Sequence, residues 1–254
     1  VTMGKAKYHD QFRPLPPGFE KVPFNNVSAL RDSVGDGTAA VIIEPVQGEG
    51  GIHTVSREFM AAAREVCDRH GALLILDEIQ CGAGRTGRFF AYEHYGITPD
   101  VVTMAKGLGG GFPIGAVLAT ESAASAFEPG DHGTTFGGNP LACAVADSVV
   151  ETIATPGMME SVTEKGRHLM ESLRGLAETS GAIAEVRGIG LMVGVELECS
   201  APKVVSGMID RGVLANYTSE RVLRMVPPFV ITAEQLDAAV RALAESLKEV
   251  CDGK

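Results

Sequence analysis

The sequence lacks the features that mark several common classes of protein. No apolar run approaches the roughly 18 residues of a membrane span, and no signal peptide is visible. Positive charge is scarce, since the formal net charge is -10, which argues against nucleic acid and membrane surfaces as partners. The five cysteines form no C-x-x-C pair and the six histidines no H-E-x-x-H pattern. We therefore expect no metal site and no disulfide framework, but free thiols in a reducing, cytoplasmic compartment.

Glycine, in contrast, is abundant, and it gathers in a few short stretches. The chain has 31 glycines in 254 residues, against a usual share of about 7%. Such stretches serve tight turns or let a ligand approach the backbone closely. The glycine-rich stretches are therefore the first places to look for a binding site.

Short apolar runs alternate with stretches of helical spacing along the first 155 residues. The predicted strands are Ala39–Ile43, Ala72–Leu76, Val101–Met104 and Ile114–Thr120. A helix is predicted over Arg57–His70, with Gly71 as its C-terminal cap, and another begins at Asn139-Pro140. This alternation predicts an α/β fold with a mostly parallel sheet and flanking helices.

The pattern of predicted helices and strands changes after Thr155-Pro156-Gly157. A long helix is predicted over 159–179, strands over 191–197 and 222–226, and Thr232-x-x-Gln235 is a capping box that opens a last helix. We therefore predict a large domain over residues 1–155 and a smaller α+β domain over residues 156–254.

Lys106 lies in an unusual setting for a lysine. It follows an apolar strand and precedes the glycine-rich stretch 107–111. One interpretation is an ordinary loop lysine near a sheet edge. The other is a partly buried amine whose pKa is lowered, which would be a nucleophile able to form an imine.

Asp77 ends the strongest predicted strand, at the carboxyl edge where α/β sheets place their ligands. Gln80 follows three residues later. A Walker B element is an alternative for Asp77-Glu78, but the chain has no G-x-x-x-x-G-K-[ST] motif. Residues 82–87 match G-x-G-x-x-G, yet they do not begin at the strand's end, and no acidic residue follows at the required distance. A nucleotide-binding site is therefore the weaker interpretation.

Three further features carry little information by themselves. The stretch HGTTFGGNP (132–140) precedes a helix and suits a phosphate group, although an ordinary capped loop has the same composition. Glu49, between glycines, and Arg224, on a predicted strand, are unremarkable alone. The histidines are interpreted as structural.

Taken together, five motifs resemble the class III aminotransferases, the ornithine and acetylornithine group, and they occur in that family's order. The resemblance covers nearly the whole chain, and the motifs are jointly specific. They are EPVQGEGG (44–51), LILDEIQCGAGRTG (74–87), DVVTMAKGLGGGFPIGA (100–116), HGTTFGGNPLACA (132–144) and LRMVPPFVIT (223–232). The resemblance implies a fold-type I transferase that uses pyridoxal 5'-phosphate and forms a homodimer.

The resemblance also implies which residues contact the cofactor. Lys106 would bind it covalently and later move a proton between substrate and cofactor. Asp77 would pair with the ring nitrogen, and Gln80 would lie near the ring hydroxyl. Thr135 would bind the phosphate of the cofactor held by the neighbouring subunit.

The implied substrates are an ω-amino acid and the pair glutamate and 2-oxoglutarate. Arg224 would bind the α-carboxylate of glutamate, and Glu49 would mask Arg224 when the other substrate is bound. The stretches EVRGIGLMVGVEL (185–197) and LANYTSERVLRMVPP (214–228) resemble enzymes acting on N-acetylornithine more than those acting on ornithine or 4-aminobutyrate. The implied reaction gives a semialdehyde and glutamate, in arginine biosynthesis.

Several alternatives stay open at this point. An ornithine or 4-aminobutyrate aminotransferase is one, and an aminomutase or decarboxylase of the same superfamily is another. A non-catalytic remnant or a nucleotide-binding domain belongs to a different class. We also expect a fragment that is inactive alone, because the chain begins with Val1 and its first 25 residues show no helix or strand.

Overall fold

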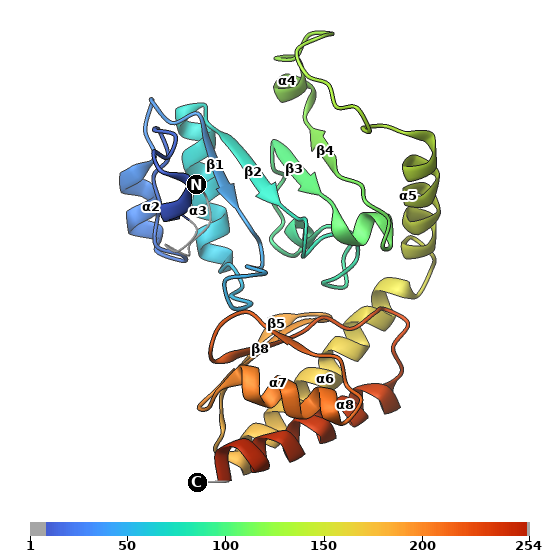
Figure 1. Ribbon diagram of the computed structural model, residues 1–254. Helices are drawn as coiled ribbons and strands as arrows, with labels where there is room; N and C mark the ends of the chain where they lie inside the picture. Colours follow the sequence, from blue (N-terminus) through green and yellow to red (C-terminus); the bar gives the residue numbers. More distant parts are fainter. Residues whose placement is uncertain (1–8, 253–254) are drawn as a thin grey trace.

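The computed structural model describes residues 9–252 and divides their strands between two sheets (Figure 1). The first sheet has the order β1-β2-β3-β4, in which β1, β2 and β3 run parallel and β4 runs antiparallel to β3. The elements of this part are η1 (Asp10–Phe12), α2 (Val27–Ser33), β1 (Ala40–Ile43), α3 (Arg57–His70), β2 (Leu73–Asp77), η2 (Ala91–His94), β3 (Val101–Met104), η3 (Lys106–Gly109), β4 (Ala116–Ala119), α4 (Glu121–Ala124) and α5 (Pro140–Ile153). The predicted α/β fold with a mostly parallel sheet is confirmed.

The helices of this part begin and end where their capping residues predict. The hydroxyl of Ser56 accepts a hydrogen bond from the backbone N–H of Phe59, and Gly71 ends α3 at φ +67°. Asn139 caps α5 in the same way, just before a proline at the first helical position. The helix predicted over Arg57–His70 therefore has the predicted bounds.

The two faces of the first sheet have different surroundings. Leu74 and Leu76 of β2 are fully buried in a core that they share with Phe59 and Met60 of α3. On the opposite face, Ile42 is 49% and Val117 69% exposed. In the part of the chain that the structure describes, this second face is thus largely open to solvent.

The second sheet has the order β5-β6-β8-β7 and is entirely antiparallel. Its elements are α6 (Met158–Ser180), β5 (Ile183–Ile189), β6 (Met192–Leu197), α7 (Ala201–Asp210), β7 (Asn216–Tyr217), β8 (Val222–Met225), α8 (Ala233–Leu247) and η4, a π-helix (Lys248–Asp252). Figure 1 shows the helices α6, α7 and α8 below this sheet, on the side away from the first sheet. None of the helices within residues 9–252 is long and apolar enough to cross a membrane.

Side chains alternate between the two faces of the second sheet. Val193 and Val195 of β6 and Leu223 of β8 point into the core formed with the helices. Gly194 and Arg224 lie between these positions and pair across the two strands. Because successive strand residues point to opposite faces, they face the first sheet.

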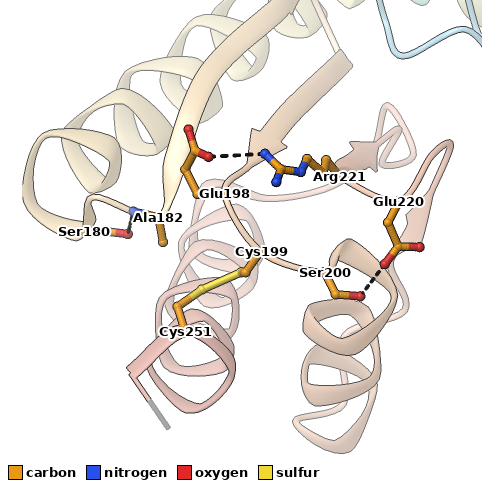
Figure 2. Close-up of a disulfide and its surroundings, with 8 residues drawn as sticks. All are labelled: Ser180, Ala182, Glu198, Cys199, Ser200, Glu220, Arg221 and Cys251. Atoms are coloured by element: carbon orange, nitrogen blue, oxygen red, sulfur yellow. Dashed lines mark hydrogen bonds and ion pairs between the residues drawn. A yellow bond between two sulfur atoms is a disulfide. The ribbon is translucent and has the colours of Figure 1, made fainter. Parts of the chain in front are cut away.

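The prediction that all cysteines are free thiols is wrong. Cys199, just after β6, forms a disulfide with Cys251 in η4 (Figure 2). The two residues are 52 positions apart in sequence, and they meet only because the end of the chain returns to the end of β6. Cys67 and Cys81 are free and buried, and Cys143 is free and exposed.

Candidate active site

Polar side chains collect at the carboxyl ends of the three parallel strands. Glu44 directly follows β1, Asp77 is the last residue of β2, and Lys106 lies two residues beyond β3. Ile43 pairs with Leu76 in the strand register, so Glu44 and Asp77 are neighbours on adjacent strands. In Figure 1 the β2 and β3 arrowheads point towards the second sheet, so this edge faces the C-terminal part.

Glu44 interacts electrostatically with two other charged groups at this edge, Asp77 and Lys106. Its carboxylate is partly buried and accepts a hydrogen bond of 2.9 Å from the backbone N–H of Gly48. Burial raises the pKa of Glu44 most, and the charge of Asp77 raises that pKa further, whereas the charge of Lys106 lowers it. Asp77 and Lys106 are therefore both close enough to Glu44 for their charges to act on it.

Lys106 is exposed, and the expectation of a partly buried lysine is wrong for the described residues. The physical reason is that the lysine stands at the edge of the sheet, and no described element lies over its side chain. Its backbone is unusual nonetheless, with φ +43°, a left-handed conformation that residues other than glycine adopt rarely. Backbone strain of this kind gathers at functional sites, which makes Lys106 a site candidate.

Glu49, Gln80 and Arg224 form one hydrogen-bonded group, although they lie far apart in the sequence. The guanidinium Nη1 of Arg224 donates to Glu49 Oε1 at 2.7 Å and to Gln80 Oε1 at 3.2 Å. Gln80 Nε2 in turn donates to Glu49 Oε1 at 3.4 Å. The bond from Arg224 is the main cause that lowers the pKa of Glu49, and the charge of Lys106 lowers it further. The predicted Glu49–Arg224 pair is therefore present, and the charge of Lys106 reaches it.

Thr135 is not part of this group. It lies in an exposed turn that precedes α5, and Asn139 of the same segment caps the helix. Phe136 beside it is 81% exposed. The structure therefore places five of the six predicted site residues around one edge, and Thr135 apart from them.

Two charged residues, Glu78 buried and Arg85 half-buried, support the loop that carries Gln80. Glu78 is only 1% exposed, and its carboxylate accepts the backbone N–H groups of Ala91 and Tyr92. Burial raises the pKa of Glu78 to about 7. Arg85 donates to the carbonyl oxygens of Leu191 and Pro227, and burial lowers its pKa to about 10. Both residues hold backbone in place, so we assign them structural roles.

A cavity of about 450 Å³ lies next to the glycines that follow Lys106. It is lined mostly by apolar groups, and from the C-terminal part by Phe229, whose ring lies 4.5 Å below the guanidinium carbon of Arg85. None of Glu49, Asp77 or Arg224 lines it. We therefore place the candidate site at the polar group, where the titratable side chains converge.

Sequence reasoning missed three residues of this region. Glu44 opens the motif EPVQGEGG and directly follows the predicted strand Ala39–Ile43, but the sequence assigns it no role of its own. Gly48 packs so closely on Gln80 that a Cβ atom there would overlap the Gln80 side chain. Arg187 lies in the quoted stretch 185–197 and donates to the carbonyl oxygen of Gly51. Of the three, only Glu44 has a signal in the sequence, namely its position directly after a predicted strand.

Comparison with known proteins gives a consistent picture. The family model described as "Aminotransferase class-III" matches residues 1–247. An acetylornithine aminotransferase of Methanocaldococcus jannaschii is 52% identical over 97% of this chain and 62% of its own length. One from Neisseria meningitidis serogroup B is 47% identical over 97% of this chain and 63% of its length. The chain thus spans less than two thirds of the length of these relatives.

Solved structures are similar as well. The ornithine aminotransferase of Toxoplasma gondii, described with partial occupancy of PLP at its active site, superposes with a TM-score of 0.93 at 34% identity. The match covers 98% of this chain and 60% of that one. An acetylornithine aminotransferase of Elizabethkingia anophelis gives a TM-score of 0.87 at 34% identity, over 92% of this chain and 61% of that one. Because the family model matches nearly the whole of this chain, the chain belongs to the class III aminotransferases, which have the fold-type I architecture.

Proposed function

We propose that this chain forms part of a pyridoxal-phosphate aminotransferase. The enzyme would transfer the terminal amine of N-acetylornithine, or of a related ω-amino acid, to 2-oxoglutarate in arginine biosynthesis. The observation that carries the proposal is the Glu49–Arg224 ion pair, with an N–O distance of 2.7 Å, close enough to Lys106 for the charge of the lysine to lower the pKa of Glu49. The relatives named acetylornithine aminotransferase support the choice of substrate.

The residues at the strand ends fit the cofactor. A carboxylate at the carboxyl edge, Asp77, would pair with the ring nitrogen and keep it protonated. When bound, pyridoxal phosphate withdraws electrons from the substrate carbon that loses its proton. Lys106 Nζ would bind the cofactor and then carry that proton, and its exposed position leaves the amine accessible. Gln80 would lie near the ring hydroxyl while its amide bonds to Glu49 and Arg224.

The ion pair answers a problem that a two-substrate enzyme must solve. Glutamate carries an α-carboxylate that needs a cation, whereas the ω-amine substrate presents only a neutral carbon chain near its reacting amine. Arg224 supplies the cation, and Glu49 neutralises it when the ω-amine is bound. An aminomutase or decarboxylase needs no such alternation, so the pair favours the aminotransferase over these candidates.

The decisive experiment is borohydride reduction of the purified holoenzyme, followed by peptide mapping. We expect a pyridoxyl group on Lys106 alone, and Lys106→Ala should lower transamination by several orders of magnitude. A pyridoxyl group on another lysine would refute the assignment. Holoenzyme that carries the group on Lys106 but does not transaminate would favour the non-catalytic interpretation.

We further propose a cytoplasmic homodimer in which Thr135 reaches the cofactor of the partner. The support for the dimer is that Phe127, Phe136 and Leu141, which flank Thr135, are 62–81% exposed. We also propose a domain boundary at residues 155/156, because α5 ends at Ile153 and α6 begins at Met158. Sedimentation of the Phe136→Ser variant would test the dimer, since a monomer is expected.

A further inference from the structure

Arg187, Gly194 and Arg224 form a row across three strands of the second sheet. Arg187 of β5 pairs with Gly194 of β6, and Gly194 pairs with Arg224 of β8. Cross-strand partners lie on the same face of a sheet. The two arginines therefore flank the glycine on the face that meets the first sheet.

The loop that carries Glu49 rests on this row. Arg224 Nη1 donates to the carbonyl oxygen of Gly48 at 3.2 Å, before Glu49 in the chain. Arg187 Nε donates to the carbonyl oxygen of Gly51 at 2.9 Å, after Glu49. Between the two contacts, a Cβ atom at position 194 would lie 2.8 Å from Cβ of Ile52, so only glycine leaves room for the loop. Glu49 is thus held from both sides.

The loop needs this support because its backbone is strained. Ile52 is fully buried and has φ +60°, a left-handed conformation that is a clear outlier for a β-branched residue. Such a conformation persists only where neighbouring contacts determine it. Gly51, which Arg187 holds, is the residue directly before it.

Arg187 is well fixed itself. It is only 9% exposed, and its Nη1 lies 2.6 Å from carboxylate oxygens of both Glu185 and Glu196. Its charge also helps to lower the pKa of the neighbouring His53, for which burial is the larger cause. The two ion pairs explain why a charged Arg187 is buried. They do not explain its third bond, from Nε to the carbonyl oxygen of Gly51, which reaches the loop of Glu49.

We propose that Arg187 is a positioning residue that keeps Glu49 on Arg224 by holding Gly51. It thereby sets how readily Arg224 is uncovered, and so how strongly the enzyme prefers dicarboxylate substrates over the ω-amine. This inference rests on the proposed function, in which Glu49 and Arg224 alternate between two substrates. It assigns the arginine of the motif EVRGIGLMVGVEL a role in substrate selection.

The test uses holoenzyme that spans the length of the relatives, and glutarate as the probe. Glutarate has two carboxylates and no reacting group, so its dissociation constant, measured by calorimetry, reports how accessible Arg224 is. Arg187→Met should tighten glutarate binding about fivefold and raise the glutamate-to-ω-amine ratio of kcat/KM by a similar factor. Arg187→Lys, which keeps the charge but not the planar fork, should give a smaller change.

A double mutant separates positioning from any other effect. Glu49→Ala alone should tighten glutarate binding at least as much as Arg187→Met does. Arg187→Met added to Glu49→Ala should then change nothing further, because the residue through which Arg187 acts is gone. If Arg187→Met has its full effect without Glu49, or no effect with it, the inference is wrong.

Arg221→Met is the matched control. Arg221 lies just before β8, and its guanidinium pairs with Glu198 (Figure 2). The glutarate affinity of the Arg221→Met variant should equal that of the wild type. If Arg187→Met does not fold, as judged by its melting curve, the Arg187→Lys variant and its combination with Glu49→Ala give the same comparison. A wild-type holoenzyme without transaminase activity would refute the proposed function, while the glutarate measurements would still decide the role of Arg187.

Discussion

Replacing Gly190 by alanine should destabilise the protein far more than the same change at Gly181. Gly190 lies in the turn between β5 and β6, where φ is +56°. A Cβ atom there would be 2.7 Å from the carbonyl carbon of Thr86 and 2.8 Å from the carbonyl oxygen of Arg85. The turn is therefore packed directly against the backbone of Arg85 and Thr86. Backbone atoms cannot rotate out of the way as a flexible side chain can.

The magnitude has two separate contributions. Alanine in the left-handed region costs about 1 kcal/mol, and pushing a methyl group against well-packed backbone costs about 1–3 kcal/mol more. The melting temperature should fall by roughly 2–4 °C for each kcal/mol in a protein of this size, or roughly 4–16 °C in all. Gly181 ends α6 at φ +59° and has nothing within 4 Å of its added Cβ, so Gly181→Ala should show the first contribution alone.

Thermal melting of both variants, followed by far-UV circular dichroism, measures the difference directly. Because the two glycines have nearly the same φ, the comparison removes the backbone contribution and leaves the close approach of the turn. Equal losses in the two variants would refute the view that this contact joins the two parts of the chain. Gly190→Ala should also weaken the bond from Leu191 N–H to Arg85, since the turn must move away.

Two further predictions concern stability. Cys199→Ser should lower the free energy of unfolding by about 4 kcal/mol under oxidising conditions, because the lost disulfide closes a loop of 52 residues. The same substitution should have no effect in the presence of a reductant. Cys143→Ser, which changes a free cysteine, should leave the free energy of unfolding unchanged under both conditions. The pKa of Glu78 is raised from 4.5 to about 7, so the folded protein holds a proton there that the unfolded chain releases. Its contribution to stability is therefore present below pH 4.5 and is lost as the pH rises to about 7, by up to about 3 kcal/mol. Unfolding measured across this range should show the decline in the wild type, and an identical decline in Glu78→Gln would contradict the assignment.

The sequence predicts the local elements of the first part well, because their signals are local. Ser56, Gly71 and Asn139 cap their helices through contacts that span three or four residues. The strands β1, β2 and β3 are short, mostly apolar and bounded by polar residues or turns. The strand β5, which no sequence prediction included, is interrupted by Glu185 and Arg187 and has no apolar run to mark it.

The candidate site is harder to predict because its contacts are not local. The motifs name Glu49, Gln80 and Arg224, but the order β5-β6-β8-β7 decides what lies beside Arg224. Arg187 reaches Gly51 across 136 positions of sequence, a distance at which spacing carries no information. The disulfide between Cys199 and Cys251 is hidden for the same reason. What a single sequence reveals is thus the residue types, while their pairing depends on sheet register.

The exposure of the two partners indicates which half of the ion pair would move in the proposed alternation between two substrates. The side chain of Glu49 is 56% exposed, whereas that of Arg224 is 12% exposed. Arg224 is also held by three other acceptors, namely Asn216 Oδ1 at 3.1 Å, the carbonyl oxygen of Gly48 at 3.2 Å and Gln80 Oε1 at 3.2 Å. If Glu49 leaves, Arg224 keeps these bonds and its position, so the guanidinium stays in place for an incoming carboxylate. The carboxylate of Glu49 meets water when it moves, which keeps its desolvation cost small. The geometry therefore favours an arrangement in which Arg224 stays fixed and the side chain of Glu49 moves. This arrangement requires that the backbone of the Glu49 loop stay in place while the side chain of Glu49 turns.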